Sequence, residues 1–319
     1  MLKNIFNNNC IKLKINNILF IGYSGGVDST VLLNLSQIIF KKSIYNIFAI
    51  HINHNLNINN LLWEKNCIFN CKKNKIILFI LKIKIKKNNN LEKKSRNLRL
   101  EIWNKIIPNN SSLFLAHHEE DQIETIFFKL IKGLNYLSKI YGIKNKIKLK
   151  KIYILKPLLM VNKKIIKLYA YKKDLIWIND NSNNNNYHDR NFIRNIIMPI
   201  IKKRWYFINK SLKEIKKLLL NNNIFLKKII KNHYIKTLIK KHNIISINYL
   251  LNLSFFIRIE VIKYWIFKNK ITIKSNKYLK IINNDFLNLN KNKKNILIIS
   301  KYKIKKYLNK LYILKNKNF

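Results

Sequence analysis

The stretch Ile18-Leu-Phe-Ile-Gly22-Tyr-Ser24-Gly-Gly-Val-Asp-Ser29 decides the fold of this chain. Apolar residues, several of them β-branched or aromatic, dominate 17–23, which predicts a buried strand there. The glycines that follow predict a tight turn, and the apolar spacing from Val31 onward predicts a helix. A turn between a strand and a helix favours phosphate binding, because free N–H groups and the positive helix end lie there. An ordinary strand-to-helix turn with a Ser or Asp cap is the alternative.

The same alternation of strand and helix continues along the chain. Apolar runs predict further strands at 45–52, 76–83 and 112–116, and helical spacing predicts helices at 59–73, 91–107 and 119–132. This order indicates βαβ units, a parallel sheet and an α/β fold. Scarce residue types lie at or just beyond the ends of three strands, at 24–29, at His51 and His54, and at 117–124. Since ligands of such sheets bind beyond the carboxyl ends of the strands, we expect these sets to share one rim.

The pattern changes near residue 205, so the sequence predicts two domains. Residues 1–205 form the expected α/β catalytic domain, and residues 206–319 the expected smaller, mainly helical domain. Two short strands are expected in the second domain, at 296–300 and 311–314.

Composition narrows the class of protein. Among 319 residues, 64 Lys and Arg stand against 14 Asp and Glu, a net charge of +50, which favours a polyanion such as nucleic acid as partner. Lys, Asn and Ile dominate the whole chain, so compositional drift explains part of that charge. No apolar run reaches the roughly 18 residues of a membrane span. Three cysteines cannot form a disulfide framework, so we expect a cytoplasmic protein.

Acidic residues are scarce, yet four of the fourteen lie in His117-His118-Glu119-Glu120-Asp121-Gln-Ile-Glu124-Thr125. Asp121 and Glu124 are three residues apart and therefore neighbours on a helix surface. A carboxylate pair suits a cationic amine, Mg²⁺ or proton transfer. The alternative is that acids simply favour a helix N-terminus, where the macrodipole stabilises them.

Ser24-Gly-Gly-Val-Asp-Ser29 resembles the pyrophosphate loop of the N-type ATP pyrophosphatases. The resemblance implies that ATP is cleaved between its α- and β-phosphates to adenylate a carbonyl oxygen. It also implies that Ser24, Gly25, Gly26, Val27, Asp28 and Ser29 bind ATP and that Asp28 holds Mg²⁺. The stretch lacks Gly-Lys-Ser/Thr, so it is not a Walker A loop.

Further motifs narrow the resemblance to the tRNA(Ile)-lysidine synthase family. The strongest is Trp177-Ile-Asn-Asp180-Asn-Ser-Asn183, followed by Arg190-Asn-Phe-Ile-Arg194. The tandem histidines with Asp121 and Glu124 also fit, as does Lys156-Pro-Leu-Leu159, where Lys replaces an Arg of the family. Residues 91–99 resemble a family helix with the pattern Glu-x-x-x-Arg-x-x-Arg.

This resemblance implies ligation of L-lysine to C2 of the wobble cytidine of tRNA(Ile) with a CAU anticodon. The implied catalytic residues are Asp28, Asp121, Glu124, Arg190 and Arg194. Rim residues are expected at His51, His54, His117 and His118, and contacts to tRNA or substrate at Arg96, Arg99, Asp180 and Asn183. The second domain is expected to contact tRNA, and the oligomeric state is left open, with a homodimer as one option.

Two other functions stay open at this point. Related enzymes that introduce sulfur into tRNA carry Cys-x-x-Cys, and here Cys67 and Cys71 are four residues apart instead. A non-catalytic basic RNA-binding protein with a relic loop would also have the high positive charge.

Overall fold

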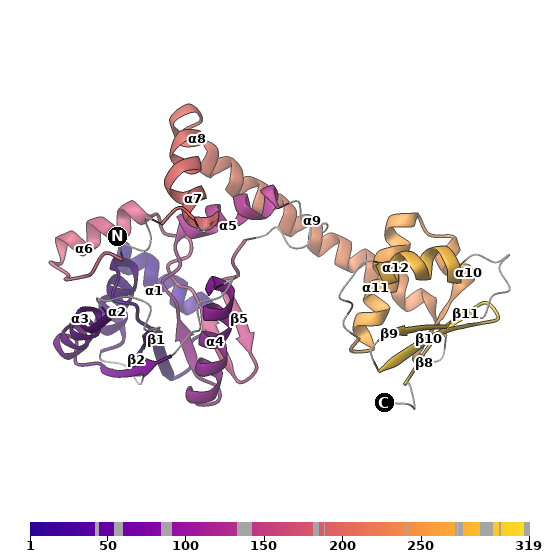
Figure 1. Cartoon of the computed structure of the whole chain (residues 1–319), viewed down its shortest axis with the longest axis horizontal. Helices are drawn as coiled ribbons and strands as arrows, with labels where there is room; N and C mark the ends of the chain where they lie inside the picture. Colours follow the sequence, from indigo (N-terminus) through magenta and orange to yellow (C-terminus); the bar gives the residue numbers. More distant parts are fainter. Residues whose placement is uncertain are drawn as a thin grey trace. The chain divides into compact units, whose positions relative to one another are not determined.

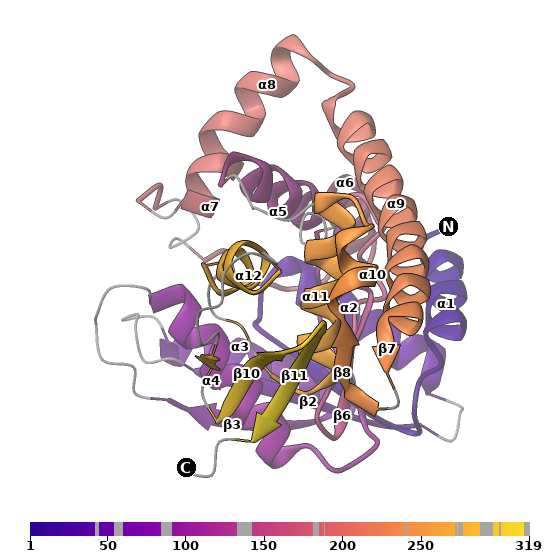
Figure 2. The same ribbon diagram turned by 90° about the vertical axis from the view of Figure 1, so that its right-hand side faces the viewer.

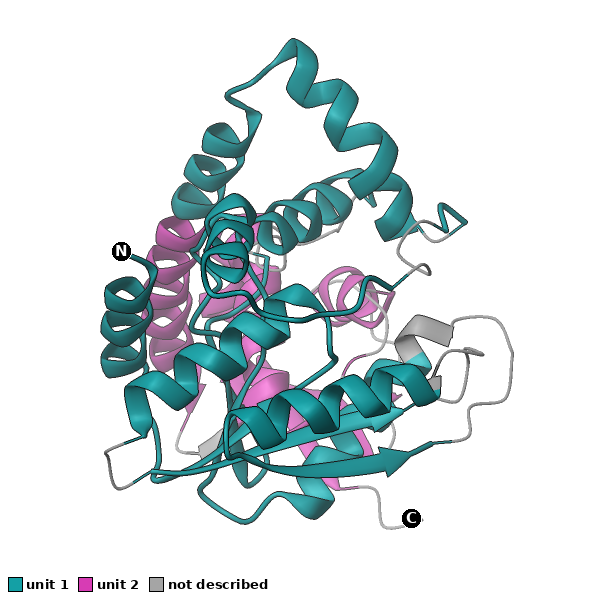
Figure 3. Cartoon of the chain, turned by 90° about the vertical axis from the view of Figure 1, so that its left-hand side faces the viewer, with its two compact units in different colours: residues 1–219 teal, residues 220–319 magenta. Residues whose placement is uncertain are grey.

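The computed structural model describes residues 1–41, 45–53, 60–83, 91–132, 142–180, 185–187, 189–239, 241–271, 273, 277–287, 296–299 and 301–315. The chain divides into two compact units, residues 1–219 and 220–319 (Figure 3). The predicted boundary near 205 lies between helices α8 (Met198–Arg204) and α9 (Ile208–Thr237).

The first unit is built on a six-stranded sheet in the order β3-β2-β1-β4-β6-β5. All neighbours pair in parallel except the antiparallel β5 and β6. The parallel α/β fold expected from the sequence is therefore confirmed. The strands are β1 (Ile18–Gly22), β2 (Asn46–Asn53), β3 (Ile77–Lys82), β4 (Ser112–Phe114), β5 (Lys146–Leu149) and β6 (Ile152–Leu155).

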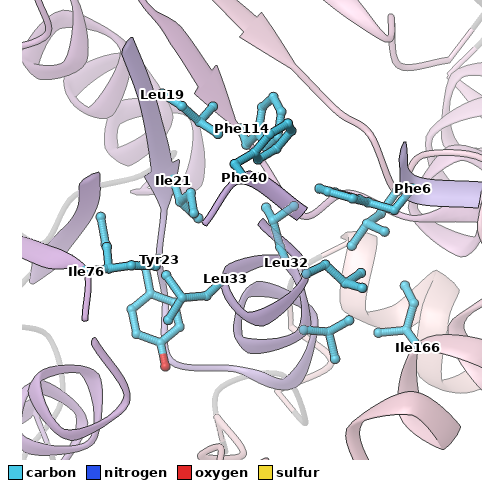
Figure 4. Packing of buried hydrophobic residues seen from close by; sticks show 14 of the residues in the cluster. Phe6, Leu19, Ile21, Tyr23, Leu32, Leu33, Phe40, Ile76, Phe114 and Ile166 are labelled. Carbon is cyan, nitrogen blue, oxygen red and sulfur yellow. The ribbon is translucent and has the colours of Figure 1, made fainter. Parts of the chain in front are cut away.

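Helices cover both faces of this sheet (Figure 1). Alternate residues of β1 point to opposite faces, so Leu19 and Ile21 join one core, and Phe20 joins another. The first core also holds Phe6, Leu32 and other apolar side chains of the helices (Figure 4). The helices besides α8 and α9 are α1 (Leu2–Leu13), α2 (Val27–Phe40), α3 (Asn60–Lys73), α4 (Leu91–Ile106), α5 (Glu119–Ile131), α6 (Lys163–Lys172), α7 (Asp189–Phe192) and the π-helix η3 (Ile193–Ile197).

The second unit contains helices and an antiparallel sheet in the order β7-β8-β11-β10-β9. Trp265, Ile304 and Leu311 lie in its core. The expected strands at 296–300 and 311–314 correspond to β9 (Ile296–Ile299) and β11 (Lys310–Lys315). The other elements are β7 (Leu238–Ile239), β8 (Lys241–Ser246), α10 (Ile247–Leu251), α11 (Phe255–Lys268), α12 (Lys277–Ile281), the π-helix η4 (Ile282–Phe286) and β10 (Tyr302–Tyr307).

One arginine closes the end of α10. Arg258 Nε donates to the carbonyl of Leu250 at 2.9 Å, and its Nη2 donates to those of Leu251 and Leu253 at 3.1 and 2.9 Å. These bonds join the last two carbonyls of α10, and one just beyond its end, to a single side chain at the place where helical carbonyls lack intrahelical partners. Across the described part of the chain, no helix is long and apolar enough to cross a membrane.

Candidate active site

Hydroxyl groups of the glycine-rich loop and of the helix after it bond within this segment. Gly25 has φ +82°, a left-handed conformation that glycine adopts without steric cost. Ser29 Oγ and Thr30 Oγ1 donate to the carbonyl of Gly26 at 2.9 and 3.0 Å, and Ser24 Oγ lies 3.0 Å from Ser29 Oγ. The helix α2 begins at Val27, so its first N–H groups lack intrahelical partners and are available to an anion.

His51 lies beneath this loop. Its Nδ1 is 2.9 Å from the carbonyl oxygen of Tyr23 and 3.6 Å from Cys67 Sγ, and the ring is buried. Burial lowers the pKa of His51, so the neutral ring is favoured. The geometry gives His51 a supporting contact to the loop backbone. His54 and Asn183, the other predicted residues of these motifs, lie outside the described residues.

Asp28 stands at the start of α2 and faces α5 and α6. Its carboxylate forms an ion pair with Lys163 Nζ, and its Oδ2 lies 3.7 Å from His118 Nε2. Lys163 is fixed in turn at the start of α6, where its backbone N–H donates to Glu120 Oε2 at 2.9 Å. Sequence reasoning missed Lys163, because one lysine among so many carries no signal.

His118 connects the loop to the acidic helix. Its Nδ1 lies 3.2 Å from Glu120 Oε2, and its Nε2 lies 3.6 Å from Asp121 Oδ2. Burial acts to lower the pKa of His118, but the contact with Glu120 and the charges of Asp121 and Asp28 outweigh burial and raise it. The site therefore favours a protonated His118 held among three carboxylates.

Asp121 and Glu124 form a compact cluster with two arginines. Arg190 Nη2 donates to Asp121 Oδ1 at 2.9 Å, and its Nε donates to Glu124 Oε2 at 3.2 Å. Arg194 donates to Glu124 at 2.6 and 2.8 Å and to Asp121 at 3.0 Å. Burial would raise the pKa of Asp121, but His118 and Arg190 more than compensate and lower it. Arg190 and Arg194 therefore pair with buried acids and are not simply charges on a solvent-exposed helix surface.

A second group of cations surrounds His117. Lys156 is buried, and its Nζ donates to the carbonyl of Lys144 at 3.0 Å. Burial, with a contribution from Arg96, lowers the pKa of Lys156 to about 8. Burial lowers the pKa of His117 to about 4. The charge of Asp121 acts to raise this pKa, whereas the charges of Lys156, Arg190 and Arg96 lower it further. Arg99, on the same helix as Arg96, lies 6.0 Å from the ring centroid of Trp103.

The Trp177 motif reaches the phosphate loop. The N–H of Ile178 donates to the carbonyl of Gly25 at 3.0 Å, and Trp177 Nε1 donates to Asn179 Oδ1 at 3.2 Å. Asp180, two residues beyond Ile178, is half-buried. The structure thus brings residues 24–29, 117–124, 163, 177–178, 190 and 194 into one continuous set of contacts.

The chemistry of this set fits a nucleotide with its cation. Backbone N–H groups and hydroxyls at 24–29 suit phosphate oxygens, and the Asp28 carboxylate is the kind of oxygen ligand Mg²⁺ takes beside phosphates. The guanidinium groups of Arg190 and Arg194 suit further phosphate charge. A loop of this kind between β1 and α2 of a parallel sheet defines the class of PP-loop ATP-binding proteins.

Comparison with known proteins agrees with this class and narrows it. The family model described as PP-loop domain matches residues 1–201. The tRNA(Ile)-lysidine synthase of Buchnera aphidicola subsp. Schizaphis graminum is 35% identical over 303 residues, which are 92% of this chain and 66% of the relative. That of Wigglesworthia glossinidia brevipalpis is 31% identical over 304 residues, 92% of this chain and 76% of the relative. The chain belongs to the tRNA(Ile)-lysidine synthase family, as the sequence motifs predict.

A solved structure shares the fold. The U34-tRNA thiolase NcsA from Methanococcus maripaludis superimposes with a TM-score of 0.56 at 18% identity, covering 68% of this chain and 78% of that chain. The present chain spans about two thirds of the length of the first relatives that it matches.

Proposed function

We propose that this chain is an ATP-dependent ligase that joins L-lysine to C2 of the wobble cytidine in tRNA(Ile) with a CAU anticodon, acting in the cytoplasm. The observation that carries the proposal is the continuous network from Asp28 through His118 to Asp121, Glu124, Arg190 and Arg194. This network joins an anion-binding loop to a buried pair of acids. One site can therefore bind a triphosphate at the loop and an amine at the acids.

In the first step, the loop at 24–29 holds the phosphates of ATP while the C2 oxygen of the cytidine attacks the α-phosphate. Pyrophosphate leaves, and the loop N–H groups stabilise its charge. Bound at Asp28, Mg²⁺ would neutralise phosphate charge. Arg190 and Arg194 stabilise the adenylated cytidine. The target base leaves the anticodon stack to reach this site.

In the second step, the ε-amino group of lysine attacks C2 and AMP departs. We assign Asp121 and Glu124 to the α-ammonium group of the lysine substrate, because the lowered pKa of Asp121 keeps it charged and makes it a weak base. The ε-amine attacks in its neutral form, and the proton that it loses as the C2–N bond forms passes to water while the C2–O bond to AMP breaks. We assign Arg96 and Arg99 to tRNA phosphates, and Asp180 and Asn183 to substrate contact. The second unit is proposed to contact tRNA.

Incorporation of radiolabelled lysine tests this function. The complete reaction contains tRNA(Ile) with CAU, ATP and Mg²⁺, and the control tRNA differs only at the wobble base. We expect ATP-dependent labelling confined to the cytidine form. Tight tRNA binding without labelling would refute the ligase and support a relic loop, whereas sulfur-dependent modification would support the thiolating alternative.

A matched pair of variants tests the acid cluster. Asp121→Asn removes a charge that contacts Arg190, Arg194 and His118, and we expect the KM for lysine to rise at least tenfold. Glu119→Gln removes a charge from the same helix turn that pairs with Lys213 at 2.8 Å instead. Equal effects of the two variants would remove Asp121 from lysine binding.

A further inference from the structure

Three aromatic residues in succession lie exposed where α8 meets α9. Trp205, Tyr206 and Phe207 are 50, 86 and 49% exposed, and we call these three residues the aromatic tip. Figure 2 shows that the turn carrying them stands clear of the α/β layers of the first unit. Exposed large apolar groups gathered at one place mark interaction sites more often than isolated ones do.

Backbone hydrogen bonds close the turn that carries the aromatic tip. The N–H of Trp205 donates to the carbonyl of Ile201 at 2.7 Å, and that of Ile208 to the carbonyl of Trp205 at 3.1 Å. The N–H of Lys210 donates to the carbonyl of Phe207 at 2.8 Å. These bonds restrict the backbone of the turn, so less backbone freedom is lost when a partner binds than in an open loop.

Charge around the aromatic tip selects the partner. Lys203 and Arg204 directly precede it and are exposed, and exposed Lys210 follows it. Glu214 is the nearest acid along α9, seven residues beyond Phe207. Aromatic rings beside cations are the combination that binds single-stranded nucleic acid, with bases stacked on rings and phosphates paired with cations. A purely apolar protein partner would not need this positive border.

The aromatic tip is connected to the active site by packed helices. Met198 of α8 and Leu212 of α9 pack with Ile123 of α5, the helix that carries Asp121 and Glu124. Arg194, which contacts both acids, is ten residues before Arg204, roughly 15 Å along a helix. One short RNA loop could therefore place a base near Asp121 and, at the same time, place the adjacent bases of the loop against the aromatic tip.

We propose that the aromatic tip stacks on unpaired bases of the tRNA anticodon loop, while Lys203 and Arg204 pair with the adjoining phosphates. The choice of the anticodon loop rests on the proposed function. In this arrangement the aromatic tip holds neighbouring bases and so helps to keep the target base out of the stack.

The test measures binding of the full chain to an anticodon stem-loop RNA of tRNA(Ile), without ATP or lysine. Phe207→Ala should weaken the affinity about five- to a hundred-and-fiftyfold, the range of one lost base–aromatic stack. Phe69→Ala on α3 is the matched control, since Phe69 is 52% exposed and the substitution is the same. The control should leave the affinity unchanged. Trp205→Phe should bind almost normally and Trp205→Ala weakly, since a ring is what stacking needs.

Salt dependence separates stacking from charge. Arg204→Ala should reduce the slope of log affinity against log salt concentration by about 0.7 to 0.9, whereas Phe207→Ala should leave the slope unchanged. An unchanged affinity in Phe207→Ala would overturn the proposal, and so would a change in oligomeric state without a change in RNA binding. If lysine is incorporated but Phe207→Ala binds RNA normally, the stacking fails and the ligase stands. If Phe207→Ala loses binding but wild-type protein forms no lysidine, the stacking proposal stands and the ligase proposal fails.

Discussion

Replacing Arg194 by Ala should destabilise the first unit measurably. Arg194 makes three hydrogen bonds to Asp121 and Glu124, and the Glu124 side chain is only 5% exposed. Breaking a buried ion pair commonly costs about 3–5 kcal/mol, because the remaining charge stays buried. Arg194 itself is 34% exposed, so water screens part of the interaction, and Arg190 still contacts both acids. We therefore expect a loss of about 2 kcal/mol.

Calorimetric melting measures this loss. For a unit of this size, about 2 kcal/mol corresponds to a decrease of roughly 4–8 °C in Tm. Because the chain has two compact units, the transitions must be assigned separately. Trp265→Phe, in the core of the second unit, identifies the other transition. Arg204→Ala is the control for arginine loss, because Arg204 is exposed and its removal should change stability by less than about 0.5 kcal/mol.

A double-mutant cycle shows whether the ion pair is the cause. Glu124→Gln removes the buried charge, so Arg194→Ala should cost less in that background, with a coupling of about 1 kcal/mol or more. Strictly additive effects, or equal losses for Arg194→Ala and Arg204→Ala, would refute the reasoning.

Three further predictions concern the loop and the buried cations. Asp28→Asn should weaken ATP binding at least tenfold in the presence of Mg²⁺ but little without it, as measured by calorimetric titration; an unchanged Mg²⁺ dependence would contradict the assignment. The pKa of Lys156 is about 8 in the folded chain, against 10.5 ordinarily, so between these pH values the unfolded chain binds more protons and the free energy of unfolding rises with pH. Urea melts should show this rise in the wild-type chain and its loss in Lys156→Met. Gly25→Ala should cost roughly 1–2 kcal/mol because of the positive φ. Its new Cβ would lie 3.2 Å from Cys67 Sγ. If the backbone is responsible for the cost, Cys67→Ala would relieve that contact without restoring the stability, as measured by urea melts; recovery of stability would contradict the backbone explanation.

The local part of the site could be predicted from the sequence. The strand, loop and helix around Ser24–Ser29 depend on neighbouring residues, and their periodicity is strong. Asp121 and Glu124 stood out because acids are rare, and Arg190 and Arg194 because arginine is rare. Rarity therefore identified the members of the ion cluster, which come from elements about 70 residues apart.

The pairing within the site could not be predicted. The contact of Asp28 with Lys163 depends on how α6 packs beside α2, and nothing distinguishes Lys163 locally. The helix α1 was also missed, although Leu2, Phe6 and Cys10 repeat at four-residue spacing and lie buried. Its many Asn residues have low helix propensity, so only tertiary packing explains it. The strand β8 (Lys241–Ser246) carries too little alternation of polar and apolar residues to identify it.

Arg258 gives the composition of the chain a further meaning. Its guanidinium reaches three carbonyls from two nitrogens, which a single ammonium on a lysine cannot reproduce. Only six of the 64 basic residues are Arg, and Arg190 and Arg194 likewise each use two nitrogens at once. If compositional drift replaced arginine by lysine at every position where a positive charge alone sufficed, the drift tested each arginine for whether lysine could replace it. The arginines that remain then mark the places where the shape of the cation, and not only its charge, was under selection.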